Sequence, residues 1–265
     1  VNLPDIGTFL DRVDVQRGGQ TPTGTVSYGA RMDFVTRSIP DNPFAEINSS
    51  VGSFSTFHNS VSAGTGLINN RFSALATFSD IRSDGYIDRA DAKLNSCFFT
   101  AQYKLLNFKK NKDYGTLNFN LLYGTEKTGL AWNAVPADSL ATNRTYNSCG
   151  EYYTDNGERK YYADEKDHYT QTHYQLSYSK VFDSNDLSWT GKFTATAHLT
   201  RGLGYYQQYK DDKKPSKYGL QALDTIFSRA DFITQKYLDN YFYGLHTEYR
   251  SEERRVGKEC RLLCR

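Results

Sequence analysis

The stretch LSWTGKFTATAHLT, residues 187–200, decides the fold because it alternates apolar and polar side chains with a period of two. Residues at i and i+2 of a β-strand lie on the same face of a sheet, so the pattern predicts a strand with one apolar and one polar face. Its length is also informative, because soluble strands average about five or six residues whereas about ten cross a bilayer as a tilted strand.

The same alternation recurs along most of the chain. It predicts about eight strands, near residues 44–53, 58–66, 71–79, 95–106, 115–126, 168–182, 187–200 and 236–250. The connections at 67–70, 107–114 and 183–186 are short and polar, whereas those at 80–94, 127–167 and 201–235 are long. A short first connection at 54–57 is the exception. Alternation of short turns with long loops is typical of outer-membrane β-barrels.

A barrel strand would present the two sets of residues 187–200 to different surroundings. We expect one set to face lipid, namely Leu187, Trp189, Phe193, Ala195 and Leu199. We expect the other set to face the lumen, namely Thr190, Lys192, Thr194, Thr196 and His198. Tyrosines near strand ends fit the aromatic girdles at the two membrane interfaces: Tyr123, Tyr169, Tyr237 and Tyr249.

Composition limits the class of protein. The 265 residues include 32 basic and 30 acidic side chains, and the net charge of +2 argues against a nucleic-acid surface. No apolar run exceeds three residues, so we expect no transmembrane helix. Because Val1 opens a polar segment, we expect no signal peptide either. Yet 15% of the residues are aromatic, as half-buried strands require.

The last fifteen residues, SEERRVGKECRLLCR at 251–265, differ from the rest. They hold five basic and three acidic residues and two of the four cysteines. The stretch resembles a translated sequencing adapter; the alternative is a genuine basic tail with C-x-x-x-C spacing. We therefore expect 251–265 to be a non-native tail outside the fold. The remaining Cys97 and Cys149 are too few to define a disulfide framework or a zinc site.

Glycines and prolines separate short strands in the first forty residues, and this pattern predicts the end of a small separate domain. The run Val13–Gly18 followed by 24–36 resembles the end of the plug of TonB-dependent outer-membrane receptors, where a strand ends in Arg-Gly before a Gly-rich turn. Arg17, Gly18 and Gly29 carry this plug motif. Later runs resemble the early barrel strands of the same family: 51–54, 64–72, 83–90 and 141–147.

The resemblance implies an all-β fold, an antiparallel transmembrane β-barrel fragment preceded by the end of a plug. Residues 1–38 would then be plug and 39–250 the first barrel strands. It implies a receptor in the cell outer membrane that takes up a small molecule or metal chelate, such as a ferric siderophore, haem or cobalamin. The implied partners are outer-membrane lipid and the energy-coupling TonB complex, reached through a missing N-terminal part. It implies no cofactor, no nucleic acid and no catalysis.

Exposed loop aromatics can bind ligand or simply pack against one another. The candidates lie in the long connections: Trp132, Tyr152, Tyr153, Tyr161, Tyr162, Tyr205 and Tyr206. The acidic run from Asp80 to Asp91 has the outline of a calcium loop, but Arg82 stands where an oxygen ligand is needed, so a solvated loop is favoured. We expect no metal site.

Two other hypotheses remain. A passive porin or adhesin barrel would have no plug. An outer-membrane enzyme would need a Ser/His/acid set, and Ser177, Ser179 and His173 share one parity without an acid beside them. For the receptor, we expect an open, curved antiparallel sheet whose first and last strands, 44–53 and 236–250, are not hydrogen-bonded to each other. We expect residues 11–36 to lie against its concave polar face.

Overall fold

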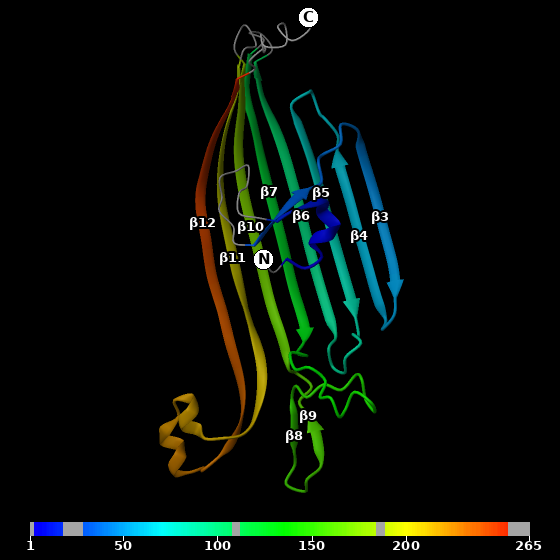
Figure 1. Ribbon diagram of the computed structural model, residues 1–265, viewed down its shortest axis with the longest axis vertical. Helices are drawn as coiled ribbons and strands as arrows, with labels where there is room; N and C mark the ends of the chain where they lie inside the picture. The colour runs from blue at the N-terminus through cyan, green and yellow to red at the C-terminus, as the bar shows by residue number, and fades with distance from the viewer. Residues whose placement is uncertain (1–2, 18–28, 108–111, 184–188, 254–265) are drawn as a thin grey trace, which may run out of the picture.

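Eight strands form one antiparallel sheet, in the order β12-β11-β10-β7-β6-β5-β4-β3 (Figure 1). The computed structural model describes residues 3–17, 29–107, 112–183 and 189–253. The strands of the sheet are β3 (Pro43–Gly52), β4 (Thr56–Thr65), β5 (Phe72–Ser83), β6 (Ala92–Asn107), β7 (Lys112–Gly129), β10 (Lys166–Asp183), β11 (Trp189–Lys213) and β12 (Ala230–Glu253). All eight strands predicted from the alternation are thereby confirmed.

The remaining elements are small. They are two hairpins, β1 (Leu10–Arg17) with β2 (Ala30–Thr36) and β8 (Glu151–Tyr153) with β9 (Arg159–Tyr161), and three 3-10 helices, η1 (Ile6–Phe9), η2 (Pro215–Tyr218) and η3 (Gln221–Thr225). Among the described residues, no helix has the length and apolar character needed to cross a membrane.

The strands extend further than the sequence pattern predicts. β11 has 25 residues and β12 has 24, so the expected loop at 201–235 shrinks to 214–229. Ladder hydrogen bonds continue to the pair Lys213↔Ala230, although the outer part of β11 is polar on both faces and shows no alternation. At its other end β12 continues through residues 251–253, which we had assigned to the tail, while 254–265 lie outside the described residues.

Connections sort to the two ends of the sheet as expected. The loops 84–91, 130–165 and 214–229 follow strands that run one way, and the turn 66–71 follows one that runs the other (Figure 1). The turns at 108–111 and 184–188 lie outside the described residues, but the strands flanking them end at the same side as 66–71. The short connection 53–55 lies with the long loops, because the Asp84 N–H donates to the Phe54 carbonyl at 2.9 Å.

Cross-strand register assigns each residue to a face, because directly paired residues point to the same side of a sheet. Thr200 pairs with His173, which pairs with Leu122, and Leu122 is buried beneath the N-terminal segment. By parity, the face of Leu122 also carries Lys192, Thr194, Thr196 and His198; we call it the polar face. The opposite, apolar face carries Trp189, Phe193, Ala195, Ala197 and Leu199.

The predicted division of the residues 189–200 is therefore confirmed, while Leu187 lies outside the described residues. One girdle assignment is wrong. Tyr169 lies on the polar face, where it is buried and donates its hydroxyl proton to Asn240 at 3.3 Å. Tyr123, Tyr237 and Tyr249 have the parity of the apolar face.

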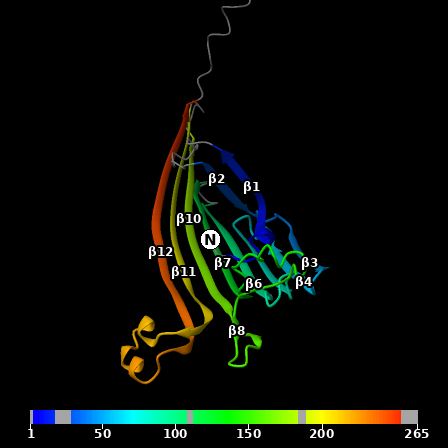
Figure 2. The ribbon, with the colours of Figure 1, turned by 60° about the horizontal axis from the view of Figure 1, so that its bottom comes forward.

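The N-terminal segment packs on the polar face through a small core (Figure 2). Phe9 is fully buried and stacks on Phe98 with ring centroids 5.5 Å apart, next to Leu75 and Leu122. A Cβ at Gly124 would come within 2.5 Å of Pro4, so this close approach requires glycine.

The expected placement of residues 11–36 against the sheet is wrong in detail, because residues 3–9 and Ile39 make the core contact instead. The β1–β2 hairpin leaves its own apolar side chains about half exposed, namely Val13, Val15, Met32 and Phe34. Apolar and polar residues alternate in β1 and β2 because the two strands pair with each other. The sequence pattern alone could not distinguish this pairing from packing of the hairpin on the sheet.

The sheet is open, as expected. β3 and β12 are its two edge strands and are not paired with each other. Each edge presents unpaired N–H and C=O groups, which are costly in lipid and adhesive in water.

We expect Ala197→Arg to destabilise the full-length protein in lipid vesicles by about 2–4 kcal/mol, because it puts a cation near the middle of the apolar face. The matched variant Thr196→Arg, on the polar face of the same strand, should cost far less. Urea titration of the vesicle-inserted protein measures both. Equal losses for the two variants would contradict the face assignment.

Candidate functional site

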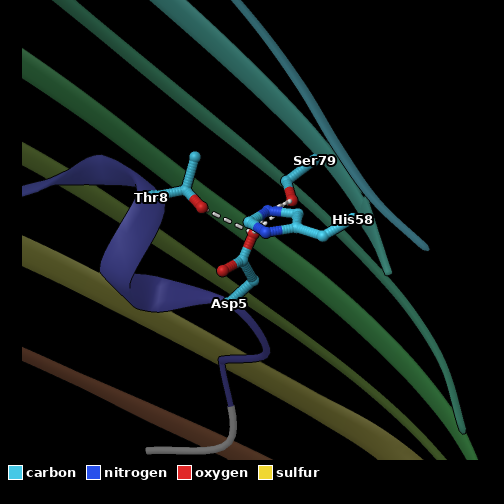
Figure 3. Close-up of polar contacts among 4 residues, drawn as sticks. All are labelled: Asp5, Thr8, His58 and Ser79. Atoms are coloured by element: carbon cyan, nitrogen blue, oxygen red, sulfur yellow. Dashed lines mark hydrogen bonds and ion pairs between the residues drawn. The ribbon is translucent and has the colours of Figure 1, made fainter. Parts of the chain in front are cut away.

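A carboxylate anchors the N-terminal segment to the sheet (Figure 3). Asp5 precedes η1 in a left-handed conformation, with φ at 53°, which Asp tolerates better than most residues. Its Oδ2 accepts a hydrogen bond from Thr8 at 2.6 Å and contacts His58 Nε2 at 3.0 Å. Ser79 donates its hydroxyl proton to the same oxygen. His58 and Ser79 come from β4 and β5, so one side chain joins η1 to two strands.

This Ser–His–Asp set is not arranged for nucleophilic catalysis. The relay needs the acid on one ring nitrogen of histidine and the serine on the other. Here the same ring nitrogen, His58 Nε2, lies 3.0 Å from Asp5 Oδ2 and 3.2 Å from Ser79 Oγ. Ser79 also bonds the acid directly. The geometry is that of an anchor, in which one carboxylate collects several donors.

Two of the residues considered for an enzyme, His173 and Ser177, have other partners. His173 Nδ1 lies 2.7 Å from Thr200 Oγ1, and Ser177 Oγ lies 3.0 Å from Thr196 Oγ1. These are cross-strand contacts on the polar face, and they give no acyl-transfer site.

Two of the predicted ligand aromatics meet on the polar face at the loop end. Trp132, from the loop 130–165, lies edge-on to Tyr206 of β11 with centroids 4.8 Å apart. The Lys236 ammonium lies 5.4 Å from the Tyr206 ring centroid. Trp132 is 55% exposed, so an aromatic edge and a cation lie together at this surface.

Other predicted aromatics serve packing. Tyr152 and Tyr162 both contact the Tyr209 ring, at 4.8 and 5.6 Å between centroids. The Tyr162 oxygen accepts from the Gln207 amide at 3.0 Å. Burial raises the pKa of Tyr162, as expected of a ring held in a packed layer. This group fixes the loop 130–165 against β11.

Tyr161 belongs to a second packing group. The Arg89 guanidinium stands 3.8 Å from the Tyr161 ring centroid and donates to the carbonyls of Asn147 and Cys149. Buried Asn147 in turn donates to the carbonyls of Asp88 and Leu130, both at 2.8 Å. The two loops 84–91 and 130–165 are thus held together by main-chain carbonyls that polar side chains satisfy.

The last two predicted aromatics lie elsewhere. Tyr205 points to the apolar face and stacks on His168, with centroids 5.2 Å apart. Tyr153 is exposed on the β8 strand and donates to Glu151 at 2.9 Å. The structure therefore brings together only part of the predicted set.

The plug motif is partly described. Arg17 ends β1, and Gly29 enters β2 with φ at 100°, a conformation that favours glycine; Gly18 lies outside the described residues. In the calcium-like run, Asp80 bonds Arg82 and Asp91 pairs with Lys166. Within the described ranges no three metal-ligating side chains converge.

Among known proteins, those that resemble this chain do so in fold. It matches no protein-family model and no curated protein. It does match solved structures over 92% of its length. The open form of the ferric-catecholate import receptor Fiu from E. coli K12 aligns at 13% identity with a TM-score of 0.55, and the closed form at 12% and 0.56. The unliganded ferric citrate transporter FecA aligns at 15% and 0.51.

The chain has the fold of part of a TonB-dependent receptor. It spans about a third of the length of these proteins, namely 36% of the open Fiu chain, 34% of the closed one and 36% of FecA. The resemblance read from the sequence is confirmed at the level of the barrel strands.

Within this receptor fold, we expect Asp5→Ala to weaken attachment of residues 3–9 by about 2 kcal/mol, because charged hydrogen bonds of part-buried groups contribute about that much. Hydrogen exchange in η1 should accelerate by roughly 30-fold in the full-length protein. Asp11→Ala, an exposed acid of β1, is the matched control. Unchanged η1 protection in Asp5→Ala would show that the apolar core alone holds the segment.

We expect the docking of loop 130–165 to depend on pH through Glu165. Burial raises the pKa of the Glu165 carboxyl. The Tyr209 N–H donates a hydrogen bond to Glu165 Oε1 at 2.8 Å, which lowers the pKa by a smaller amount. A raised folded-state pKa stabilises docking at low pH, and this contribution is lost as pH rises through that pKa. Protection of the Tyr209 amide should therefore fall as pH rises from about 4 toward neutrality.

Glu165→Gln keeps the acceptor and removes the titration, so its protection should change little over the same pH range. The exposed Glu158→Gln should behave like the wild type. A Glu165→Gln profile as steep as the wild-type profile would contradict this assignment.

Proposed function

We propose that this chain is part of an outer-membrane receptor for TonB-dependent active uptake of a ligand such as a ferric siderophore, haem or cobalamin. The observation that carries the proposal is the sheet itself: an open antiparallel barrel wall with one apolar face and an N-terminal segment anchored on the other. The proposed location is the cell outer membrane, with the apolar face in contact with outer-membrane lipid.

Residues 1–38 are proposed as the end of the plug and 39–250 as the first barrel strands. Asp5, Phe9 and their partners would then hold plug to barrel wall. Arg17, Gly18 and Gly29 are proposed as the plug motif of this segment. Contact with the energy-coupling TonB complex is assigned to a part of the receptor that this chain does not include.

The ligand would meet the polar face at the loop end. There Trp132, Tyr206 and Lys236 combine aromatic surface with a positive charge, which suits an anionic, ring-containing chelate. Tyr152, Tyr161 and Tyr162 support the loop that carries Trp132, and Tyr153 extends from its hairpin. No bond in the cargo is made or broken in this scheme.

A passive porin or adhesin barrel is the alternative. The segment of residues 3–9 argues against this alternative, because a segment packed on the inner wall of a barrel would obstruct a passive pore.

The test is uptake by the full-length receptor in cells. We expect ligand accumulation to stop when the energy-coupling complex is deleted. In the double variant Trp132→Ala/Tyr206→Ala, the apparent affinity for the ligand should fall about 30-fold, as for a central aromatic hot spot. Tyr205→Ala, the neighbouring ring on the apolar face, should leave ligand affinity unchanged. Uptake that persists without energy coupling would favour the passive alternative.

A further inference from the structure

The chain on either side of Trp132 is fixed by hydrogen bonds, although the Trp132 side chain itself is 55% exposed. On one side, Leu130 is 1% exposed and its carbonyl accepts a hydrogen bond from the Asn147 amide at 2.8 Å. On the other side, the Asn133 amide donates to Ser148 Oγ at 2.9 Å. Trp132 therefore lies between two attached residues, and both are attached to the same short stretch of the loop.

We call this stretch, residues 147–149, the template segment. Its first residue, Asn147, is 2% exposed and uses its whole side-chain amide. The nitrogen donates to the carbonyls of Leu130 and Asp88, both at 2.8 Å, and the oxygen accepts from the Cys149 N–H at 2.9 Å. The template segment is thereby joined to the stretch that carries Trp132 and to the neighbouring loop 84–91.

Arg89 holds the template segment from the loop 84–91. Its guanidinium donates to the carbonyls of Asn147 and Cys149 and stands 3.8 Å from the Tyr161 ring centroid. Its backbone is left-handed, with φ at 59°, and such a conformation persists only where the surrounding contacts enforce it. Glycine would adopt this backbone at lower cost, so the contribution of Arg89 lies in its guanidinium.

We propose that Arg89 is a positioning residue for ligand binding, which acts through the template segment to fix Trp132 against Tyr206 before a ligand arrives. Arg89 itself need not touch the ligand. A ligand then meets an aromatic surface that is already in place, so that no ordering of the loop opposes binding. The inference rests on the proposed function in taking Trp132 as a ligand contact.

The test follows Trp132 in the full-length receptor labelled with 5-fluorotryptophan. Its fluorine NMR resonance is assigned by its absence in Trp132→Phe. In Arg89→Gly, which suits the left-handed backbone, this resonance should move toward the position of solvent-exposed fluorotryptophan even without ligand. Arg159→Ala is the matched control, because this exposed arginine of the same loop lies 5.9 Å from the Tyr146 ring centroid and should leave the resonance in place.

Chemical rescue separates positioning from a general loss of stability. Methylguanidinium at millimolar concentration should return the Trp132 resonance of Arg89→Gly to its wild-type position, because it can donate to the same carbonyls beside Tyr161. It should not do so in Asn147→Ala, whose resonance should also move. The double variant should resemble Asn147→Ala alone, since both residues act through the template segment. An unchanged resonance in Arg89→Gly, absence of rescue, or additive effects would overturn the proposal.

Binding is measured in parallel with three probes: a ferric tris-catecholate, haemin and cyanocobalamin. For a probe that binds the wild type, the affinity of Arg89→Gly should fall in proportion to the fraction of Trp132 that has left its place by fluorine NMR. Wild-type affinity in Arg89→Gly despite a moved resonance would overturn the role of Arg89 in binding. If none of the three binds the wild type, the proposed transport function fails for these ligand classes, whereas the fluorine measurements still decide whether Arg89 positions Trp132.

Discussion

Every face assignment in this chain depends on the hydrogen-bond register between neighbouring strands. From β4 to β12 each pair is in continuous antiparallel register, with irregularities only near the strand ends Lys104/Leu106 and Lys210/Lys213. A slip of one residue would exchange Lys192 and Phe193 between the two faces. The register therefore determines which side chains lie on the apolar face and which lie on the polar face with the N-terminal segment.

The two faces are stabilised differently. On the polar face a core of four buried side chains and the carboxylate of Asp5 hold residues 3–9. On the apolar face many large side chains are exposed, and Tyr243 of β12 is 77% exposed. A soluble protein would bury such a surface, whereas a barrel wall leaves it for the hydrocarbon of the membrane. The anchor lies on one face of the sheet and the exposed apolar surface lies on the other.

The sequence predicted the strands because their faces differ in polarity, as between Leu187 and Thr200. It missed the outer part of β11, since Gln207 to Lys213 are polar on both faces although the ladder continues. The Asp5–His58–Ser79 anchor joins residues 53 and 74 positions apart, and no local pattern marks such pairs.

The aromatic candidates show the same limit. Parity alone places Tyr205 and Tyr206 on opposite faces, so the sequence could have separated them once the strand was known to reach them. The contact of Trp132 with Tyr206 depends on the path of a loop, and period two carries no information about loops.

The most direct test of the account is a spin-label scan of residues 193 to 200 in the full-length protein in a lipid bilayer. Oxygen, which concentrates in hydrocarbon, should relax labels at 193, 195, 197 and 199, whereas a water-soluble paramagnet should relax those at 194, 196, 198 and 200 more strongly. The accessibilities should alternate with a period of two along the whole stretch. Uniform access to water on both parities, or the opposite phase, would contradict the claim that this sheet is a barrel wall with the N-terminal segment inside.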